Sequence, residues 1–333
     1  MGRLVGREGR ALGVLVSEER SKKSDMRINV YQNYHAQELK KYLDPAFIPH
    51  DNRLNENPEY REYWLFLKMH EKGMHHEADY TGLLSWKFNE KTNIAGSEFI
   101  EFIKKNPGHD VYFINPLPFL INAYAFRNVW YQGDFYHPGL LDFMQRIMND
   151  LDYGIDLKGL TNDESTTLFC NYWVGNEIFW DRYMGFTKPI YDYLSTRLDE
   201  SKKEFISRIA DRIIGTNHIP FIFERLFSTF LSSRRDIRYL NYRYSEENLS
   251  RIPLEDKTGI LLLRRIWDSS AIAERSFVTE SIRVLIQQIL RDRQERLEGW
   301  DKIGPRVLGI KKLLVRRKGL RELLGAFLTK IAQ

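Results

Sequence analysis

Short, nearly continuous apolar runs alternate along the first half of the chain with segments in which apolar residues recur at helical spacing. Residues 79–84 and 110–115 are two such runs, and each predicts a buried β-strand. Residues 98–105 between them place their large apolar side chains on one face, as an amphipathic helix does. Strand, helix and strand in this order predict a parallel crossover and therefore an α/β fold.

The same pattern predicts further elements on both sides of this unit. Residues 27–31 predict a first strand, and residues 168–174 predict a later one. Residues 117–139 are rich in aromatic side chains and are expected to form functional loops. Helices are expected over the following segments: 36–42, 59–76, 140–148, 176–194, 201–214 and 222–231.

Beyond residue 242 the pattern becomes helical, with no further strand signals. Helices are expected over residues 258–267 and 271–297, and a polar connection near residues 243–255 separates them from the preceding domain. The chain is thus expected to have three parts: a loose N-terminal extension (1–25), an α/β domain (26–245) and a helical C-terminal region with a basic tail (246–333).

The composition is that of a globular protein from a reducing compartment. Hydrophobic residues make up 43% of the 333 residues, which is enough for a large core. Cys170 is the only cysteine, so the chain cannot form an intramolecular disulfide. No apolar run approaches the roughly 18 residues that a membrane helix needs. We therefore expect a cytoplasmic protein.

The net charge of +5 is concentrated near the end of the chain. Residues 301–333 carry nine Lys or Arg and two acidic residues, whereas residues 26–300 carry a net charge of −4. A basic tail on an acidic body weakens the case for nucleic-acid binding, which remains an alternative function through the tail. Apolar and basic pairs alternate in the tail, so we hypothesise that it holds the protein reversibly on an anionic membrane surface.

The strand predicted over residues 79–84 is followed closely by Trp86, Lys87 and Lys91. Open α/β sheets bind ligands outside the carboxyl ends of their strands, so these side chains are expected at a ligand site. A Lys acts as a point charge on phosphate, and a Trp stacks on a base or sugar. The segment therefore predicts a nucleotide site, and the alternative is a core strand whose last Trp packs under a loop.

Two further segments carry candidate chemistry. Trp130 and His137 bound a glycine-containing aromatic segment that resembles an active-site loop ahead of a helix. Asp150 and Asp152 match the D-x-D pattern of metal-dependent sugar transferases in letters only, because they follow a helix and not a strand. A metal is therefore not expected at this pair.

Histidines and one isolated ion pair complete the candidates. His75 and His76 are neighbours and point apart on a helix, so together with His70 they predict a solvated helix end in preference to a metal site. Glu224 and Arg225 stand within an apolar helix. They predict either a structural ion pair or a carboxylate that faces the cleft.

Six short motifs follow one another over about residues 26–232. They are His35, Asp51-Asn52, Asn57-Pro58-Glu59-Tyr60, Asp79-Tyr80-Thr81-Gly82-Leu83, Asn171-Tyr172 and Glu224-Arg225-Leu226-Phe227. In this order they resemble GT-A-type glycosyltransferases of capsular and surface-polysaccharide biosynthesis. The resemblance implies a Rossmann-like sheet and transfer of a sugar from a nucleotide-sugar donor to a glycan or lipid-linked acceptor. It departs from many such enzymes by having Ser85-Trp86-Lys87 in place of D-x-D.

The resemblance and the strand-exit pattern together give the predicted site. Donor-binding residues are expected to be Tyr31, Asn33, His35, Asp51, Asn52, Asp79, Trp86, Lys87 and Lys91. Acceptor-binding residues are expected to be Trp130, His137, Asn171 and Tyr172. Glu224 is the predicted general base, because the acceptor hydroxyl needs a carboxylate to take its proton. Lys87 and Lys91 can neutralise the leaving diphosphate, so no cofactor is expected, and a divalent metal at the donor site is left as an alternative. A catalytically degenerate module that only binds glycan or a partner is the main alternative.

Overall fold

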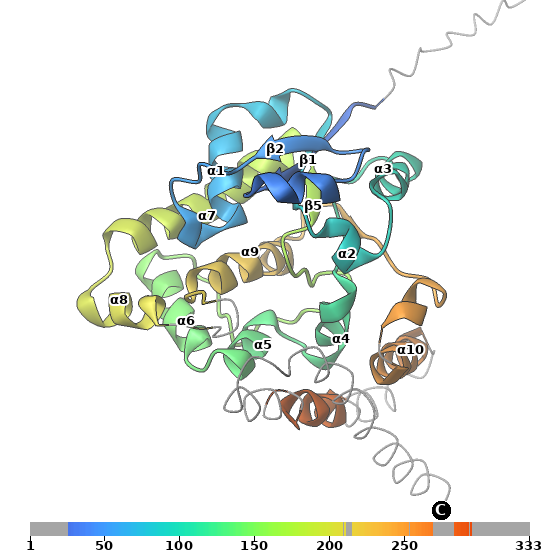
Figure 1. Ribbon diagram of the computed structural model, residues 1–333. Helices are drawn as coiled ribbons and strands as arrows, with labels where there is room; N and C mark the ends of the chain where they lie inside the picture. The colour runs from blue at the N-terminus through green and yellow to red at the C-terminus, as the bar shows by residue number, and fades with distance from the viewer. Residues whose placement is uncertain are drawn as a thin grey trace, which may run out of the picture.

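The computed structural model describes residues 26–208, 210, 215–252, 254–268, 283–292 and 294. A six-stranded sheet forms the centre of this described part of the chain (Figure 1). Its strands are β1 (Ile28–Tyr34), β2 (Ile48–Asp51), β3 (Tyr80–Ser85), β4 (Val111–Phe113), β5 (Trp173–Gly175) and β6 (Tyr239–Asn241). Across the sheet their order is β2-β1-β3-β5-β4-β6.

Five of these six strands run in the same direction. β1 pairs in parallel with β2 and β3, and β4 pairs in parallel with β6. β5 is antiparallel to both of its neighbours, β3 and β4. The carboxyl ends of five strands and the amino end of β5 therefore lie along one edge of the sheet, called here the carboxyl edge. The opposite edge is called the amino edge.

Helices cover both faces of the sheet (Figure 1). The first face packs against α1 (Glu62–Glu71), α7 (Glu177–Thr196) and α9 (Ile219–Ser233), with α5 (Val129–Tyr136), α6 (Leu140–Asp150) and α8 (Glu200–Ser207) in the same hydrophobic cluster. The second face packs against α2 (Phe88–Thr92), α3 (Gly96–Lys105), α4 (Leu117–Ala125) and α10 (Leu254–Asp268). The described residues also form the short 3₁₀ helices η1 (Gln37–Tyr42), η2 (Pro58–Tyr60), η3 (Met74–His76) and η4 (Asn248–Arg251).

Alternation along the strands divides the core between the two faces. Leu83 of β3 packs into the first cluster, and Leu84 packs into the second. Trp173 and Val174 of β5 are divided in the same way. Gly82 lets these strands approach, because a Cβ there would lie 2.6 Å from Val174 Cγ2 and 2.7 Å from the Trp173 carbonyl. Successive side chains of a strand point to opposite faces, so a strand buried on both faces needs a continuous apolar run.

The predicted α/β class is confirmed as a mixed sheet flanked by helices. The strands predicted over residues 79–84 and 110–115 are β3 and β4, and the helix predicted between them is α3. β3 and β4 run in the same direction, but they are not neighbours, since β5 lies between them.

The prediction of loops over residues 117–139 is wrong. This segment forms α4 and α5. Pro118 falls within the first turn of α4, where a missing backbone N–H costs nothing. Asn128 caps α5, because its side chain accepts hydrogen bonds from the backbone N–H groups of Trp130 and Tyr131. The aromatic side chains that suggested a loop are therefore largely helical and packed.

Two other elements are shorter in the structure than the segments predicted from their apolar residues. The helix predicted over residues 59–76 is interrupted at Arg61, which has a positive φ of 50°, and at Gly73, which is left-handed (φ 68°). These two residues separate η2, α1 and η3. The strand predicted over residues 168–174 is restricted to β5, because Cys170 and Asn171 are also left-handed. The prediction of a solvated helix end is also wrong for His75, because its side chain is only 2% exposed.

The described C-terminal helices share the core of the domain. Leu263 of α10 and Ile286 of the helix at 283–292 belong to the same hydrophobic cluster as Val30 of β1. Part of the helix predicted over 271–297 is thus present, and the rest lies outside the described residues. Residues 1–25 and 301–333 also lie outside them, so the loose extension and the membrane-binding tail stay predictions.

Candidate functional site at the carboxyl edge

The chain reverses its path across the sheet between β1 and β3. From β1 it moves outward to β2, and it then returns to β3 on the other side of β1. Open α/β sheets bind ligands outside the carboxyl ends of the strands at such a reversal. Asn33 near the end of β1 is in register with Ser85 at the end of β3. These two residues mark the centre of the candidate site.

We call the group of side chains around this reversal the carboxyl-edge site. Its members come from the ends of β1 and β3, from η1 and α2, from the loop before β5, and from α9. They are Asn33, His35, Tyr42, Ser85, Trp86, Lys87, Lys91, Cys170, Asn171, Tyr172 and Glu224.

An aromatic and cationic shelf lies at the end of β3. The Trp86 ring centroid is 5.8 Å from that of Tyr42 and 6.4 Å from that of His35. Lys87 Nζ lies 4.9 Å from the centroid of the Trp86 ring. Tyr42 and His35 are exposed, and Trp86 and Lys87 are partly exposed. The shelf can therefore receive a flat ring and a negative charge at adjacent positions.

Lys91 links the shelf to the loop before β5. It lies one helical turn after Lys87, and its Nζ is 3.2 Å from the Sγ of Cys170. Burial disfavours the Lys91 charge, but the hydrogen bond to Cys170 and the charge of Glu224 favour it more, so the pKa of Lys91 is above its ordinary value. Burial raises the pKa of the Cys170 thiol to about 12, which keeps this cysteine protonated at neutral pH. Lys91 therefore brings a positive charge to a partly buried position.

Glu224 fixes the conformation of this loop. Its Oε1 accepts a hydrogen bond of 2.7 Å from the backbone N–H of Cys170. Cys170 (φ 64°) and Asn171 (φ 54°) are consecutive left-handed residues without being glycine. Such backbone costs on the order of 1–3 kcal/mol per residue and persists where surrounding contacts hold it, often at functional sites.

Two buried amides at this edge have an unused polar atom. Asn33 Nδ2 and Asn171 Oδ1 are buried and have no hydrogen-bond partner among the residues that the structure describes. Ser85 is in register with Asn33, Tyr172 follows Asn171, and the hydroxyl groups of Ser85 and Tyr172 share a hydrogen bond of 2.6 Å. Buried polar atoms are nearly always paired, so an amide donor and an amide acceptor are available here for a ligand or for water.

Four of the predicted donor residues are not part of this group: Tyr31, Asp51, Asn52 and Asp79. The hydroxyl of Tyr31 donates to Glu77 Oε2 at 3.2 Å. Asp79 Oδ2 accepts a hydrogen bond of 2.8 Å from the backbone N–H of Arg27. Asp79 precedes β3 and therefore lies at the amino edge, on the far side of the sheet from Trp86.

Asp51 and Asn52 follow β2 at the carboxyl edge, one strand beyond β1. Asp51 Oδ2 lies 2.6 Å from Arg53 Nη2, and hydrogen bonds from Arg53 hold the pKa of the Asp51 carboxyl well below its usual range. The backbone N–H of Asn52 donates to the Tyr34 carbonyl at 2.9 Å. These contacts order the end of β2 beside the site.

Trp130 and His137 lie in packed surroundings. Trp130 is fully buried in α5, and its ring N–H donates to Thr229 Oγ1 at 2.9 Å. The His137 ring stacks on Phe221 at 4.0 Å between centroids. Burial, with help from the nearby charge of Arg225, lowers the pKa of His137 to about 3. Both side chains therefore pack in the core, and neither is among the described contacts of Trp86 or Lys91.

An ion pair between Glu224 and Arg225 was one of the alternatives, and in the structure it is a minor contact. Arg225 Nη1 is 3.8 Å from Glu224 Oε2. The buried guanidinium instead donates to the Val129 and Phe221 carbonyls and to Gln132 Oε1. The charge of Arg225 is thus satisfied elsewhere, and the Glu224 carboxylate, 22% exposed, faces the loop before β5.

The D-x-D pair has structural contacts at the far end of the first helical layer. Asp150 accepts hydrogen bonds from the Tyr193 hydroxyl and from Lys202 Nζ at 2.9 Å. Asp152 adopts left-handed backbone (φ 53°) just after α6. Both contacts hold the Asp150 carboxylate at the end of α6.

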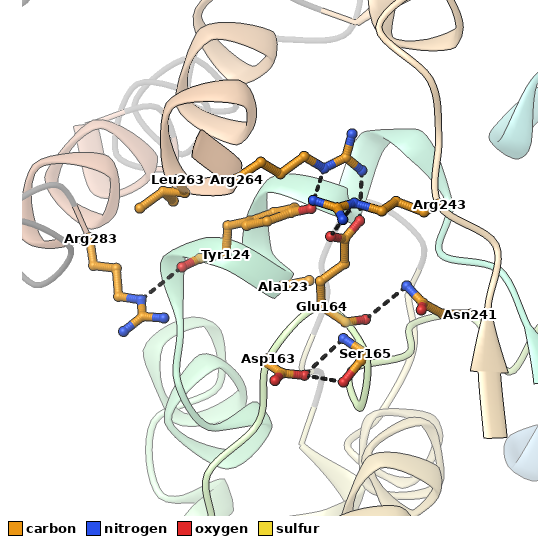
Figure 2. A pocket seen from close by; sticks show the side chains of 10 residues that line it. All are labelled: Ala123, Tyr124, Asp163, Glu164, Ser165, Asn241, Arg243, Leu263, Arg264 and Arg283. Atoms are coloured by element: carbon orange, nitrogen blue, oxygen red, sulfur yellow. Dashed lines mark hydrogen bonds and ion pairs between the residues drawn. The ribbon is translucent and has the colours of Figure 1, made fainter. Parts of the chain in front are cut away.

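A cavity of about 160 Å³ lies at the other end of the carboxyl edge, beyond β6 (Figure 2). Arg264 donates from Nε to the Tyr124 hydroxyl at 2.7 Å, from Nη1 to the Tyr244 carbonyl at 2.8 Å, and from Nη2 to Glu164 at 2.6 Å. Arg243 Nε lies 3.5 Å from the same carboxylate. This cavity is smaller than sites for drug-sized ligands, about 300–1,000 Å³. We interpret the hydrogen bonds and ion pairs along its wall as a network that fastens α10 to α4.

Comparison with known proteins finds no matching family model, no matching curated protein and no matching solved structure. Within the described residues, no helix combines the length and the apolar character needed to cross a bilayer.

Sequence reasoning missed Tyr42, Ser85 and Cys170 as members of the site. Ser85 directly precedes Trp86, and Cys170 directly precedes Asn171, so adjacency to predicted residues could have indicated both. Tyr42 ends η1 and lies 44 residues before Trp86 in the sequence, with no local signal that joins the two rings.

Proposed function

We propose that the protein is a glycosyltransferase with a GT-A-like domain, which moves a sugar from a nucleotide-sugar donor to a glycan or lipid-linked acceptor. One observation carries the proposal. Two lysines, an aromatic shelf and a partly exposed carboxylate meet at the reversal between β1 and β3. The order of motifs that resembles GT-A enzymes supports the same activity.

The donor diphosphate would lie against Lys87 and Lys91. When the sugar leaves, negative charge develops on the nucleoside diphosphate and must be stabilised. Lys87 is accessible, and Lys91 is held in place through Cys170 with its charge favoured. The base or ribose would stack on Trp86, whose ring is flanked by Tyr42 and His35.

Glu224 would act as the general base. In a direct displacement the acceptor oxygen bonds to the anomeric carbon, the bond from that carbon to the diphosphate oxygen breaks, and the acceptor proton passes to the carboxylate. The Cys170 N–H fixes Glu224 Oε1, which orients the carboxylate while Oε2 keeps capacity to accept a proton. Asn171 Oδ1, unpaired and buried beside Cys170, could hold an acceptor hydroxyl.

In the proposed mechanism the donor diphosphate needs no divalent cation, because two lysine side chains supply the positive charge. The closest sequence match to a metal-binding D-x-D is held by Lys202 and Tyr193. The donor chemistry is therefore expected to be independent of added metal.

A thermal-shift screen of the full-length protein against nucleotide sugars tests the proposal. A ligand that binds only the folded state raises the melting temperature. We expect a rise with one class of nucleotide sugar and with its nucleoside diphosphate. If no member of the panel changes the melting temperature, the proposed donor site is wrong. Binding without release of the nucleoside diphosphate would favour the glycan-binding alternative.

A further inference from the structure

A second cluster of chemically active side chains lies at the amino edge, across the sheet from the proposed donor site. It joins the end of α1, η3 and the first turns of α7. His70 Nε2 is 3.0 Å from Asp181 Oδ1, and His75 Nε2 is 3.1 Å from the same oxygen. Among the described residues, these three side chains place one ligand atom each within 4.8 Å of one another.

These distances are close to those that a tetrahedral metal imposes. Zinc binds histidine nitrogen and carboxylate oxygen at about 2.0–2.1 Å, so neighbouring ligand atoms of a tetrahedron lie about 3.3 Å apart. The two distances to Asp181 are shorter than this by a few tenths of an ångström. Small side-chain movements would therefore admit an ion between His70, His75 and Asp181.

The fold builds this convergence from three separate segments. Gly73, in left-handed backbone (φ 68°), turns the chain after α1 so that the His75 ring stacks on the His70 ring at 4.6 Å. β5 is antiparallel and ends at the amino edge, so α7 starts there and brings Asp181 across to both histidines. Glu177, one turn earlier on α7, contacts His76 Nδ1 at 3.2 Å beside the cluster.

The burial is uneven, as a three-ligand site with an open position requires. The His75 side chain is 2% exposed, and its Nδ1 is buried with no hydrogen-bond partner in the described part of the chain. The side chains of His70 and Asp181 are 29% and 53% exposed. The cluster therefore has a buried inner ligand and an outer side where water can complete four-coordination.

We propose that His70, His75 and Asp181 form a binding site for a divalent transition-metal ion of the zinc class. Two imidazoles and one carboxylate suit zinc, cobalt or nickel better than magnesium or calcium, which prefer all-oxygen ligands. The ion stabilises the junction of α1, η3 and α7. It lies at the opposite edge from Lys87 and Glu224, so the proposal is independent of the proposed transferase activity.

Calorimetric titration of untagged, EDTA-treated full-length protein with Zn²⁺ tests this site. We expect one ion per chain and a higher melting temperature, since an ion at 100 times its dissociation constant shifts the folding equilibrium about 100-fold. His70→Ala and Asp181→Asn remove partly exposed ligands and should weaken binding at least about tenfold. Far-ultraviolet circular dichroism confirms that each variant is folded.

His109→Ala is the matched control, because it removes a histidine that contacts Asn106 and Tyr112 away from the cluster. It should bind Zn²⁺ like the unchanged protein. Co²⁺ gives a second readout, an intense visible band for tetrahedral coordination that should be lost in both ligand variants. No Zn²⁺ binding, or equal affinity in the unchanged protein, His70→Ala and Asp181→Asn, would overturn the proposal.

Discussion

The carboxylate of Glu224 accepts a hydrogen bond of 2.7 Å from the backbone N–H of Cys170. This contact joins α9 to the left-handed pair that precedes β5, across 54 residues of sequence. It also sets Glu224 beside Lys91, whose Nζ reaches the thiol of the same cysteine. A carboxylate and a lysine from distant parts of the chain are thus held against one strained turn at the carboxyl edge.

Lys87→Ala should weaken binding of nucleoside diphosphates without altering the fold. A charge-assisted contact to phosphate contributes roughly 1.5–3 kcal/mol, which corresponds to about 10- to 150-fold in affinity. Titration calorimetry measures the change. Lys105→Ala, at the exposed end of α3, is the control and should bind normally. Equal affinity in both variants would remove Lys87 from the donor site.

Glu224→Gln should lower the transfer rate and keep the melting temperature. The amide oxygen of Gln can still accept the Cys170 N–H but cannot take a proton, and a positioned general base contributes typically about 10²- to 10⁴-fold. Single-turnover rates per folded molecule measure the effect. Glu62→Gln is the comparison, because Glu62 is the other carboxylate that raises the pKa of Lys91. A large rate loss only in Glu62→Gln would move the base to α1.

Arg264→Met should lower the free energy of unfolding by about 3–5 kcal/mol, because it leaves Glu164 charged and partly buried without its main partner. Urea unfolding gives this value. Arg243→Met removes the exposed partner of the same carboxylate and should cost less than about 1 kcal/mol. Similar losses in the two variants would contradict the role of Arg264 as the fastening between α10 and α4.

His137→Phe should flatten the acid side of the stability profile. The pKa of His137 is lowered from 6.5 to about 3, mainly by burial, so the unfolded chain binds a proton between these values and the folded chain does not. Its contribution to stability is therefore full above pH 6.5 and is lost as the pH falls toward 3. Urea unfolding at pH 7 and pH 4.5 measures the slope. A slope unchanged in His137→Phe would show that other groups govern it.

The sequence was most informative where one residue pattern fixes one local structure. The continuous apolar run ahead of Trp86 predicted β3, and the sided pattern of residues 98–105 predicted α3. The strand at residues 168–174 was predicted too long, because the sequence does not show that Cys170 adopts left-handed backbone. Trp130 was misplaced because an aromatic residue marks a buried helix as readily as a binding loop.

The site was predictable only in part, because it depends on contacts between distant segments. Trp86, Lys87 and Lys91 follow one strand, so their neighbourhood could be predicted from that strand alone. Glu224 could be named from its motif, but its contact with Cys170 depends on the antiparallel insertion of β5. The cluster of His70, His75 and Asp181 depends on the same insertion, since it directs α7 to the amino edge.

The most direct test of the central claim is release of nucleoside diphosphate from a nucleotide sugar by the full-length protein. The assay compares the unchanged protein with Glu224→Gln and Lys87→Ala, each with Mn²⁺ and with EDTA. We predict turnover that requires both residues and persists in EDTA at a temperature where the protein stays folded. Absence of release with every nucleotide sugar, or release that is equal in all three proteins, would contradict the account.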